Sequence, residues 1–206
     1  MVGILVITRG RSGLGATIIT LAVVLPITAA VVVLVVFDAH AYRTPSASMA
    51  PTLKVGDKLI TTKASNPRRG DILVFNPPLG ADENACGVQD FNPQAERQAC
   101  PRPTPQRSGT SFIKRVVAVG GDRVKIVAGR VYIDGRSQSE PFIRPSADCG
   151  ICDLPREITI PKGYLFMLGD NRGESADSRE WGPIPERWVV GKVRLRYSPV
   201  SDFGSP

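Results

Sequence analysis

Histidine is almost absent from this chain of 206 residues, which contains a single one, His40. Because His40 comes directly after a long apolar stretch, the rest of the chain has no imidazole to act as a general base. This absence excludes the Ser-His-Asp and Cys-His arrangements that many hydrolases use. A hydrolase made from this sequence must therefore take its base from another side chain.

Charge is absent from Ser12 to Phe37, and residues 29–37 form a continuous run of Ala, Val, Leu and Phe. A membrane-spanning helix needs ~20 apolar residues, so this stretch predicts an anchor over residues 13–37. The 166 residues from 41 to 206 remain, which is enough for one globular domain with its own core.

Arg9 and Arg11 precede the apolar stretch, so the positive-inside rule predicts that residues 1–12 are cytoplasmic and that residues 41–206 lie outside. A cleavable secretory signal is the competing interpretation, because residues 39–41 have the small-x-small pattern of a cleavage site. The apolar region is longer than the usual run of about 7 to 15 residues in such signals. We therefore favour a single-pass protein of the cell membrane, and either interpretation exports the domain.

No basic helix accompanies the net charge of +7. The Lys and Arg residues are scattered singly along segments that Gly and Pro interrupt, which is typical of a solubilising or lipid-facing surface. We therefore expect no nucleic acid partner.

No convincing helical periodicity follows residue 40. Short segments rich in Val, Ile and aromatic residues alternate instead with Gly, Pro, Asn and Asp, a pattern that predicts a mostly β domain. Tight turns are expected at 127–130 and 133–135, and a long surface loop at 77–111. The predicted strands are 58–62, 71–75, 112–119, 123–127, 130–133, 157–160, 164–168 and 188–197.

Four cysteines, Cys86, Cys100, Cys149 and Cys152, lie in the domain that we expect to be exported. Because export permits disulfides, we predict local bridges Cys149–Cys152 and Cys86–Cys100, the second closing the long loop. A zinc site, a redox centre and free thiols remain alternatives, since the Cys-x-x-Cys spacing also suits metal binding and redox chemistry.

A serine-containing segment, residues 44–53, follows the apolar stretch. Pro45 and Pro51 each fix a φ angle and disfavour helix at the preceding residue, so we expect the segment to be extended and stiff. In an extended chain Ser46 and Ser48 point to the same face. Taken alone, such a segment beside a membrane is usually a solvated linker.

Two cations, Lys114 and Arg115, interrupt the apolar run 112–119. In a strand they point to opposite faces, so a cation lies within an apolar row on either face. Burial disfavours a charged amine, so a buried Lys114 would supply a neutral base near pH 7 to 8, whereas a guanidinium keeps its proton. An edge strand with both charges in solvent is the alternative.

A polar loop, residues 169–182, follows the strand predicted at 164–168. The loop could be only a solvated turn. Its Asp177 and Arg179 could equally pair and fix the backbone, as a loop that supports a site requires.

Together and in this order, these segments closely resemble the type I signal peptidases, which are membrane-bound serine proteases of the Ser-Lys type. The resemblance implies an antiparallel β-sheet catalytic domain with an inserted β subdomain over residues 122–161, preceded by a single N-terminal transmembrane helix. Two positions depart from the family pattern, because Gly120 replaces a usual proline and Glu180 a common aromatic residue. The matching segments are 46–53, 70–75, 114–117, 121–122, 169–172 and 175–179.

The same resemblance implies roles for individual residues. Ser48 would be the nucleophile and Lys114 the general base. Ser46 and the backbone N–H of Ser48 would form the oxyanion hole, and Ser175 would orient the lysine amine. The residues implied as structural support are Asp170, Asn171, Asp177 and Arg179.

The implied function is the removal of signal peptides from exported precursor proteins, after small residues of the Ala-x-Ala type, without a cofactor or metal. Membrane lipid is the other expected partner, and the enzyme is expected to be a monomer. A conjugative-type processing peptidase with one dedicated substrate is one alternative. A catalytically inactive, membrane-tethered binding module is another, against which the intact Ser48 and Lys114 argue.

Overall fold

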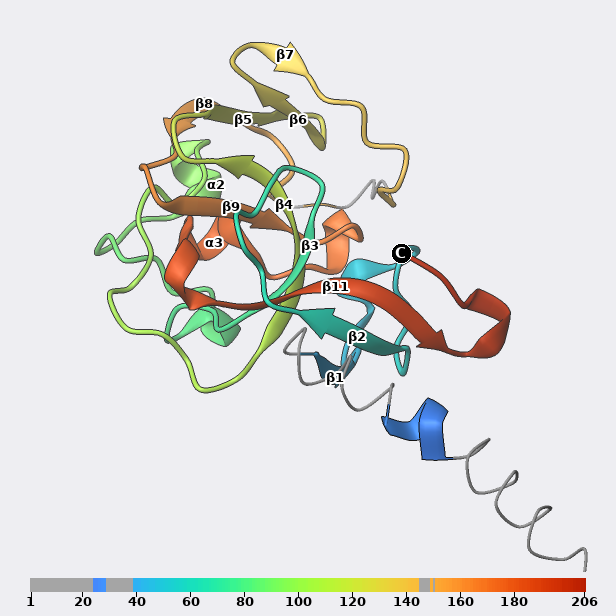
Figure 1. Ribbon diagram of the computed structural model, residues 1–206. Helices are drawn as coiled ribbons and strands as arrows, with labels where there is room; N and C mark the ends of the chain where they lie inside the picture. The colour runs from blue at the N-terminus through green and yellow to red at the C-terminus, as the bar shows by residue number, and fades with distance from the viewer. Residues whose placement is uncertain (1–23, 29–38, 145–148, 150) are drawn as a thin grey trace, which may run out of the picture. The chain divides into compact units, whose positions relative to one another are not determined.

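The computed structural model of the chain describes residues 24–28, 39–144, 149 and 151–206 (Figure 1). Residues 1–39 and 40–206 are two separate compact units. Residues 24–28 are helical, and none of the helices in the described part of the chain is long and apolar enough to cross a membrane. Most of the anchor predicted over residues 13–37 lies outside the described residues.

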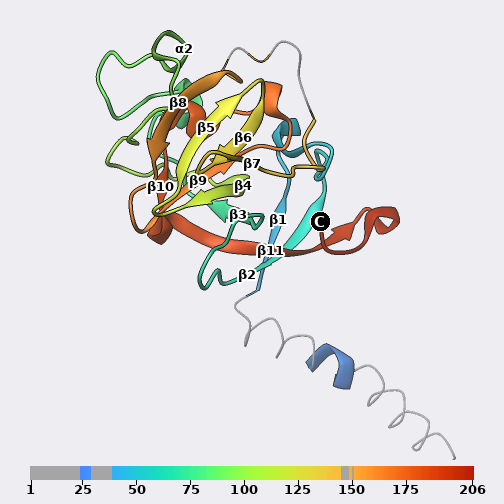
Figure 2. The ribbon, with the colours of Figure 1, turned by 90° about the horizontal axis from the view of Figure 1, so that it is seen from above.

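Seven antiparallel strands form the main sheet of the second unit, in the order β1-β2-β11-β3-β4-β9-β10 (Figures 1 and 2). Strand β4 lies inside this sheet, between β3 and β9, so the edge-strand alternative for residues 112–119 is wrong. The bounds are β1 His40–Arg43, β2 Lys58–Thr62, β3 Ile72–Phe75, β4 Phe112–Val119, β9 Tyr164–Leu168, β10 Ile184–Pro185 and β11 Val189–Ser198.

A second antiparallel sheet of four strands has the order β7-β6-β5-β8 and falls inside the segment 122–161. Its two hairpins turn at Ala128-Gly129 and Asp134-Gly135, where all four residues have positive φ angles, as two-residue turns of this kind require. Both predicted tight turns are therefore confirmed. The bounds are β5 Arg123–Val127, β6 Arg130–Ile133, β7 Arg136–Ser137 and β8 Leu154–Thr159.

The core explains why β4 and β9 are apolar on both faces. One face packs against the second sheet, through a cluster that joins Ala118 and Phe166 to Val124 and Ile126. The other face contributes Val116 to a cluster that includes Trp181. A strand buried on both faces lacks the alternation of apolar and polar residues, and a charge within it must be desolvated.

The prediction that residues 44–53 are extended is wrong at three positions, because Ala47–Met49 form a 3-10 helix, η1. The prolines on either side fix only their own φ angles and the preceding residues, so residues 47–49 can turn. The turn is closed by the N–H of Ala50, which donates to the carbonyl of Ala47 at 3.0 Å. Ser46 keeps the extended conformation, with φ −139° and ψ 168°.

The long loop at 77–111 contains a 3-10 turn, η2 (Ala81–Glu83), and a short helix, α2 (Pro93–Glu96), that Asn92 caps. Ala81 is buried in the cluster around Trp181, and the N–H of Cys100 donates to the carbonyl of Arg179 at 3.0 Å. The loop is therefore attached to the body of the domain. The other short elements are η3 (Arg172–Glu174), α3 (Ser178–Trp181), η4 (Glu186–Trp188) and η5 (Val200–Asp202).

Candidate active site

Ser48 lies in η1, at the start of a segment that two buried side chains, Met49 and Leu53, fix in the core. Its hydroxyl accepts a hydrogen bond from the hydroxyl of Ser46 at 3.1 Å. Asn171 holds the backbone of the turn, since its N–H donates to the carbonyl of Ser48 at 3.1 Å. Its side-chain amide donates to the carbonyl of Ala47 at 3.2 Å. Ser48 is thus held in one position by contacts on both sides.

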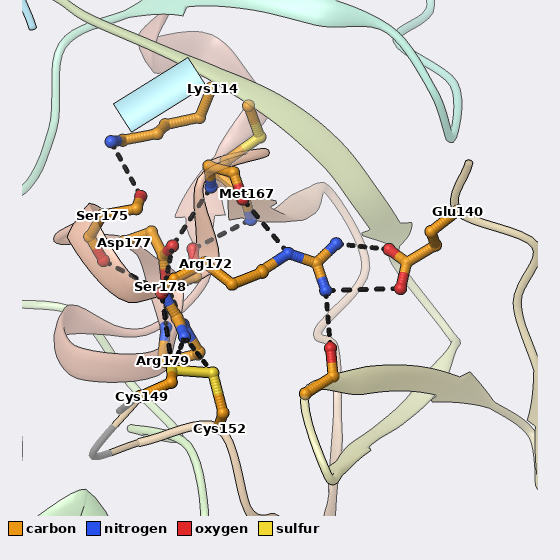
Figure 3. Close-up of polar contacts among 12 residues, drawn as sticks. Lys114, Glu140, Cys149, Cys152, Met167, Arg172, Ser175, Asp177, Ser178 and Arg179 are labelled. Carbon is orange, nitrogen blue, oxygen red and sulfur yellow. Dashed lines mark hydrogen bonds and ion pairs between the residues drawn. A yellow bond between two sulfur atoms is a disulfide. The ribbon is translucent and has the colours of Figure 1, made fainter. Parts of the chain in front are cut away.

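Lys114 lies in the interior strand β4 and is only 4% exposed. Its Nζ donates to the Oγ of Ser175 at 2.9 Å (Figure 3). The same Nζ lies 5.8 Å from the centre of the Phe112 ring. Burial lowers the pKa of the amine from 10.5 to about 8, although the charge of Asp177 opposes this shift. A measurable fraction of Lys114 is therefore neutral near pH 7 to 8 and can accept a proton.

One cavity of about 450 Å³ brings the separate sequence motifs together. Ser46, Ser48 and Lys114 all line it, from η1 and β4. Its apolar surface comes from Pro45, Met49, Phe112, Ile113 and Ala176. A serine hydroxyl and a desolvated lysine thus face a space that can hold a peptide segment with small side chains.

An ion pair fixes the loop that carries Ser175. The guanidinium of Arg179 contacts both carboxylate oxygens of Asp177, at 2.7 and 2.9 Å, and both residues are fully buried. Burial would raise the pKa of Asp177, but the charge and hydrogen bonds of Arg179 hold it below its ordinary value. Asp177 also caps the N-terminus of α3 and accepts a hydrogen bond from the N–H of Gly169 at 3.1 Å.

Arg179 reaches further than the predicted pair. Its Nη2 donates to the carbonyl of Ser175 at 3.0 Å. Its Nη1 lies 3.2 Å from the sulfur of Cys149 and 3.3 Å from that of Cys152 (Figure 3). The structure joins these two cysteines in a disulfide, and it joins Cys86 to Cys100 in another. Ser175 is thereby connected to both the ion pair and a disulfide.

The comparisons with known proteins agree with this geometry. The sequence model of the family described as "Signal peptidase, peptidase S26" matches residues 17–198. "Probable signal peptidase I-1" of Synechocystis sp. is 35% identical over 172 residues, which cover 82% of this chain and 76% of that relative. "Signal peptidase I" of Leptolyngbya laminosa is 35% identical over 174 residues, which cover 82% and 73%. The chain belongs to the signal peptidase family.

Signal peptidases of this family are serine endopeptidases, so the chain is an enzyme of this class. Among solved structures, a signal peptidase I from Enterococcus faecalis V583 is 23% identical, with a TM-score of 0.42. The aligned part covers 63% of this chain and 98% of the Enterococcus faecalis chain.

A second buried ion pair in this signal peptidase was not predicted from the sequence. Arg115 donates to both carboxylate oxygens of Asp170, at 2.9 and 2.7 Å, and Thr52 donates to the same carboxylate at 2.6 Å. Asp170 was expected as structural support, but its partners were not. Thr52 lies four residues after Ser48, and Arg115 lies in β4. Because both donate to Asp170, this carboxylate connects the segment of Ser48 to β4. Arg115 and Asp170 both lie inside segments that resemble the family, and this resemblance was the only sign in the sequence that the two residues matter.

Gly169 is required for the close packing at the site. A Cβ atom at this position would overlap the Oγ of Ser175 and the carbonyl of Ser48. The glycine therefore allows the loop with Ser175 and the segment with Ser48 to approach each other. Its position in the segment 169–172 resembles the family pattern, but the sequence alone does not indicate this role.

Glu180, where the family more often has an aromatic residue, places a carboxyl near the ion pair. Burial raises its pKa to about 7, and the charge of Asp177 adds to the shift. Its Oε2 atom is buried and has no hydrogen-bond partner among the described residues. The part of the chain that the structure describes contains no group of three His, Cys, Asp or Glu residues suited to a metal ion.

Proposed function

We propose that Ser48 is the nucleophile and Lys114 the general base of a signal peptidase that removes signal peptides from exported precursor proteins. The observation that carries this proposal is a lysine buried in an interior strand that lines the same cavity as a serine. Family membership supports the same reaction. The relatives carry the name signal peptidase I. These names do not favour the two alternatives, a conjugative-type peptidase with one dedicated substrate and a catalytically inactive binding module.

The protein groups of the mechanism all belong to Ser46, Ser48 and Lys114, which line the cavity. Neutral Lys114 removes the proton from the hydroxyl of Ser48, and the oxygen forms a bond to the scissile carbonyl carbon. The hydroxyl of Ser46 and the N–H of Ser48 donate to the resulting oxyanion. The C–N bond then breaks as the ammonium of Lys114 gives its proton to the leaving amine. Water, deprotonated in turn by Lys114, hydrolyses the ester and restores the enzyme.

Ser175 and the buried ion pairs act through Lys114 and Ser48. The hydroxyl of Ser175 accepts from the amine at 2.9 Å, so it aims the lone pair of the neutral amine and limits its rotamers. Asp177 and Arg179 hold Ser175, whereas Asp170 and Asn171 hold the segment of Ser48. We assign these four residues positioning roles.

The substrate is an exported precursor with small residues before the cleaved bond, of the Ala-x-Ala type. Apolar residues such as Met49 and Ile113 line the cavity that Ser48 also lines, which suits the small apolar side chain of alanine. We further propose that residues 13–37 anchor the enzyme in the cell membrane, with the catalytic domain outside and residues 1–12 in the cytoplasm. The charge-free stretch and the preceding arginines support this topology.

The decisive experiment is an assay of detergent-solubilised protein with an exported precursor. Ser48→Ala and Lys114→Ala should each abolish cleavage and leave the fold intact, because a nucleophile and its base act as a unit. Ser137→Ala and Lys125→Ala are matched controls in the second sheet, and both should cleave at the wild-type rate. Substantial turnover by Lys114→Ala would show that another group is the base.

A further inference from the structure

The long loop at 77–111 forms one wall of the catalytic cavity. Asp82, Thr110 and Ser111 line it together with Ser48 and Lys114. This loop lies outside the sequence motifs by which the chain resembles the family. A wall beside the nucleophile contacts whatever peptide segment the cavity holds.

Asp82 is held at the cavity by the packing of its neighbour. Ala81 is 2% exposed and lies in the cluster of Phe75 and Trp181, so the η2 turn is fixed to the sheet. The N–H of Leu79 also donates to the carbonyl of Gln106 at 2.8 Å, which joins the two arms of the loop. The backbone of Asp82 is therefore fixed beside the cavity.

The cavity lining contains more acidic than basic side chains. Besides Lys114, which must be neutral to act as the base, the charged residues of the lining are Asp82 and Glu174. Both side chains are exposed, and neither forms an ion pair within the described ranges. Glu174 is close to the nucleophile, because it accepts from the same Asn171 amide that donates to the carbonyl of Ala47.

A buried hydroxyl in the same lining also lacks a partner. Thr44 is 2% exposed, and both its backbone groups are bonded, its N–H to Asp57 and its carbonyl to Gly56. Its Oγ1 is buried and has no hydrogen bond within the described part of the chain. A buried hydroxyl without a partner is costly, but the closed position of Oγ1 keeps it away from a molecule in the cavity, so the inference below rests on the carboxylates alone.

We propose that the cavity of this enzyme selects precursors that carry a basic residue close to the cleaved bond, with Asp82 and Glu174 as the residues that recognise it. A Lys or Arg side chain reaches over small neighbours with its apolar stem and places its charge at a carboxylate. This inference rests on the proposed function and adds a substrate class to it. Asp82 and Glu174 are specificity-determining residues and take no part in the chemical step.

The test uses full-length enzyme and a set of otherwise neutral peptides with one Ala-x-Ala site. Each peptide carries a single Lys or its uncharged counterpart Gln at one position, from three residues before the cleaved bond to three after it. At one or more positions, kcat/KM for the Lys peptide should exceed that for the Gln peptide by about two- to fivefold, the range for exposed charge pairs. The ratio should fall toward one in high salt.

Asp82→Asn should bring the ratio of kcat/KM for the Lys peptide to kcat/KM for the Gln peptide closer to one. Glu83→Gln removes the next charge of the same exposed turn without changing the cavity lining, so it should keep the preference. Equal rates for all Lys and Gln peptides with wild-type enzyme, or an equal loss of preference in both variants, would overturn the inference. Failure to cleave even the neutral peptides, or cleavage by Ser48→Ala, would instead overturn the proposed function itself.

Discussion

At the scale of single residues, the burial of Lys114 sets the pH range in which the enzyme can work. The amine has a pKa of about 8 because the interior strand removes it from water. Below this pH the lysine is protonated and cannot accept the proton of Ser48. We therefore predict that kcat/KM rises tenfold per pH unit below about pH 8 and levels off above it. Rates with an uncharged peptide between pH 6 and pH 10 will check this, and a kcat/KM that stays constant between pH 6 and pH 8 would contradict the role of Lys114 as the base.

The same burial makes Lys114 a cost to stability. Its pKa of about 8 in the folded protein lies below the ordinary 10.5, so the unfolded chain binds the proton more tightly. The penalty is fully present below pH 8 and disappears as the pH rises toward 10.5. Lys114→Met should therefore be inactive but more stable at pH 7, and this advantage should shrink by roughly 2 kcal/mol between pH 7 and pH 10. Urea unfolding at both pH values measures it, and a pH-independent difference would contradict the buried charge.

The chemical role of a residue could be predicted from the sequence more fully than the partners that the residue contacts. Two features of the sequence indicate Lys114 as the base: histidine is almost absent, and a cation lies within the apolar run 112–119. The bond from Thr52 to Asp170 spans 118 positions, and the Arg115 pair depends on which strands are neighbours. Such contacts follow from the topology of the sheet, which no local pattern contains.

At the scale of elements, three of the eight predicted strands differ from the observed bounds. β3 begins one residue later than predicted, β8 covers 154–159 instead of 157–160, and β11 lies one residue further along the chain. The other five strands have the bounds predicted for them. These include β4 and β9, the strands that are buried on both faces. Strand β1 was missed because residues 40–43 have no apolar alternation, and the segment becomes a strand by pairing with β2, His40 opposite Thr61. The η1 turn was missed for a related reason, since its helical form depends on bonds to Asn171. Tertiary contacts decide both.

The loop that leads into α3 is held by the buried ion pair of Asp177 and Arg179 and by the hydrogen bonds of this pair to the backbone. Asp177→Asn would leave the guanidinium of Arg179 buried without a counter-charge, and this should cost roughly 3 to 5 kcal/mol of stability. The matched control is Asp134→Asn in a hairpin turn, where the side chains of the pair with Arg123 are about half exposed. That change should cost roughly 0 to 1 kcal/mol. Denaturant unfolding compares the two, and equal losses would mean that the Asp177 pair contributes no more than a surface contact.

At the scale of the whole molecule, the sequence predicted the exported domain but not how the long loop is used. Residues 77–111 have few β-formers and read as a surface segment. In the structure they carry Ala81 into the core and Asp82 to the catalytic cavity. A single small residue anchors the turn, and an alanine in a polar loop gives no signal that distinguishes it from its neighbours.

The length of the chain between the proposed anchor and Ser48 predicts that the site lies near the membrane. Ser48 lies 11 residues beyond Phe37. At ~3.6 Å per extended residue, the proposed anchor holds the nucleophile within roughly 40 Å of its end. An anchored enzyme and an anchored precursor then meet in two dimensions, at a raised effective concentration.

Deleting residues 1–37 should therefore leave kcat/KM on soluble peptides unchanged, because residues 40–206 form their own compact unit with Ser48 and Lys114 in it. The same deletion should slow the processing of membrane-inserted precursors, since the enzyme must then find them from solution. Time courses with proteoliposomes that contain an inserted precursor compare the two forms at equal enzyme concentration. A Ser48→Ala version of each form gives the background. If the truncated enzyme processes inserted precursors as fast as the full chain, residues 13–37 do not act as an anchor that brings enzyme and substrate together.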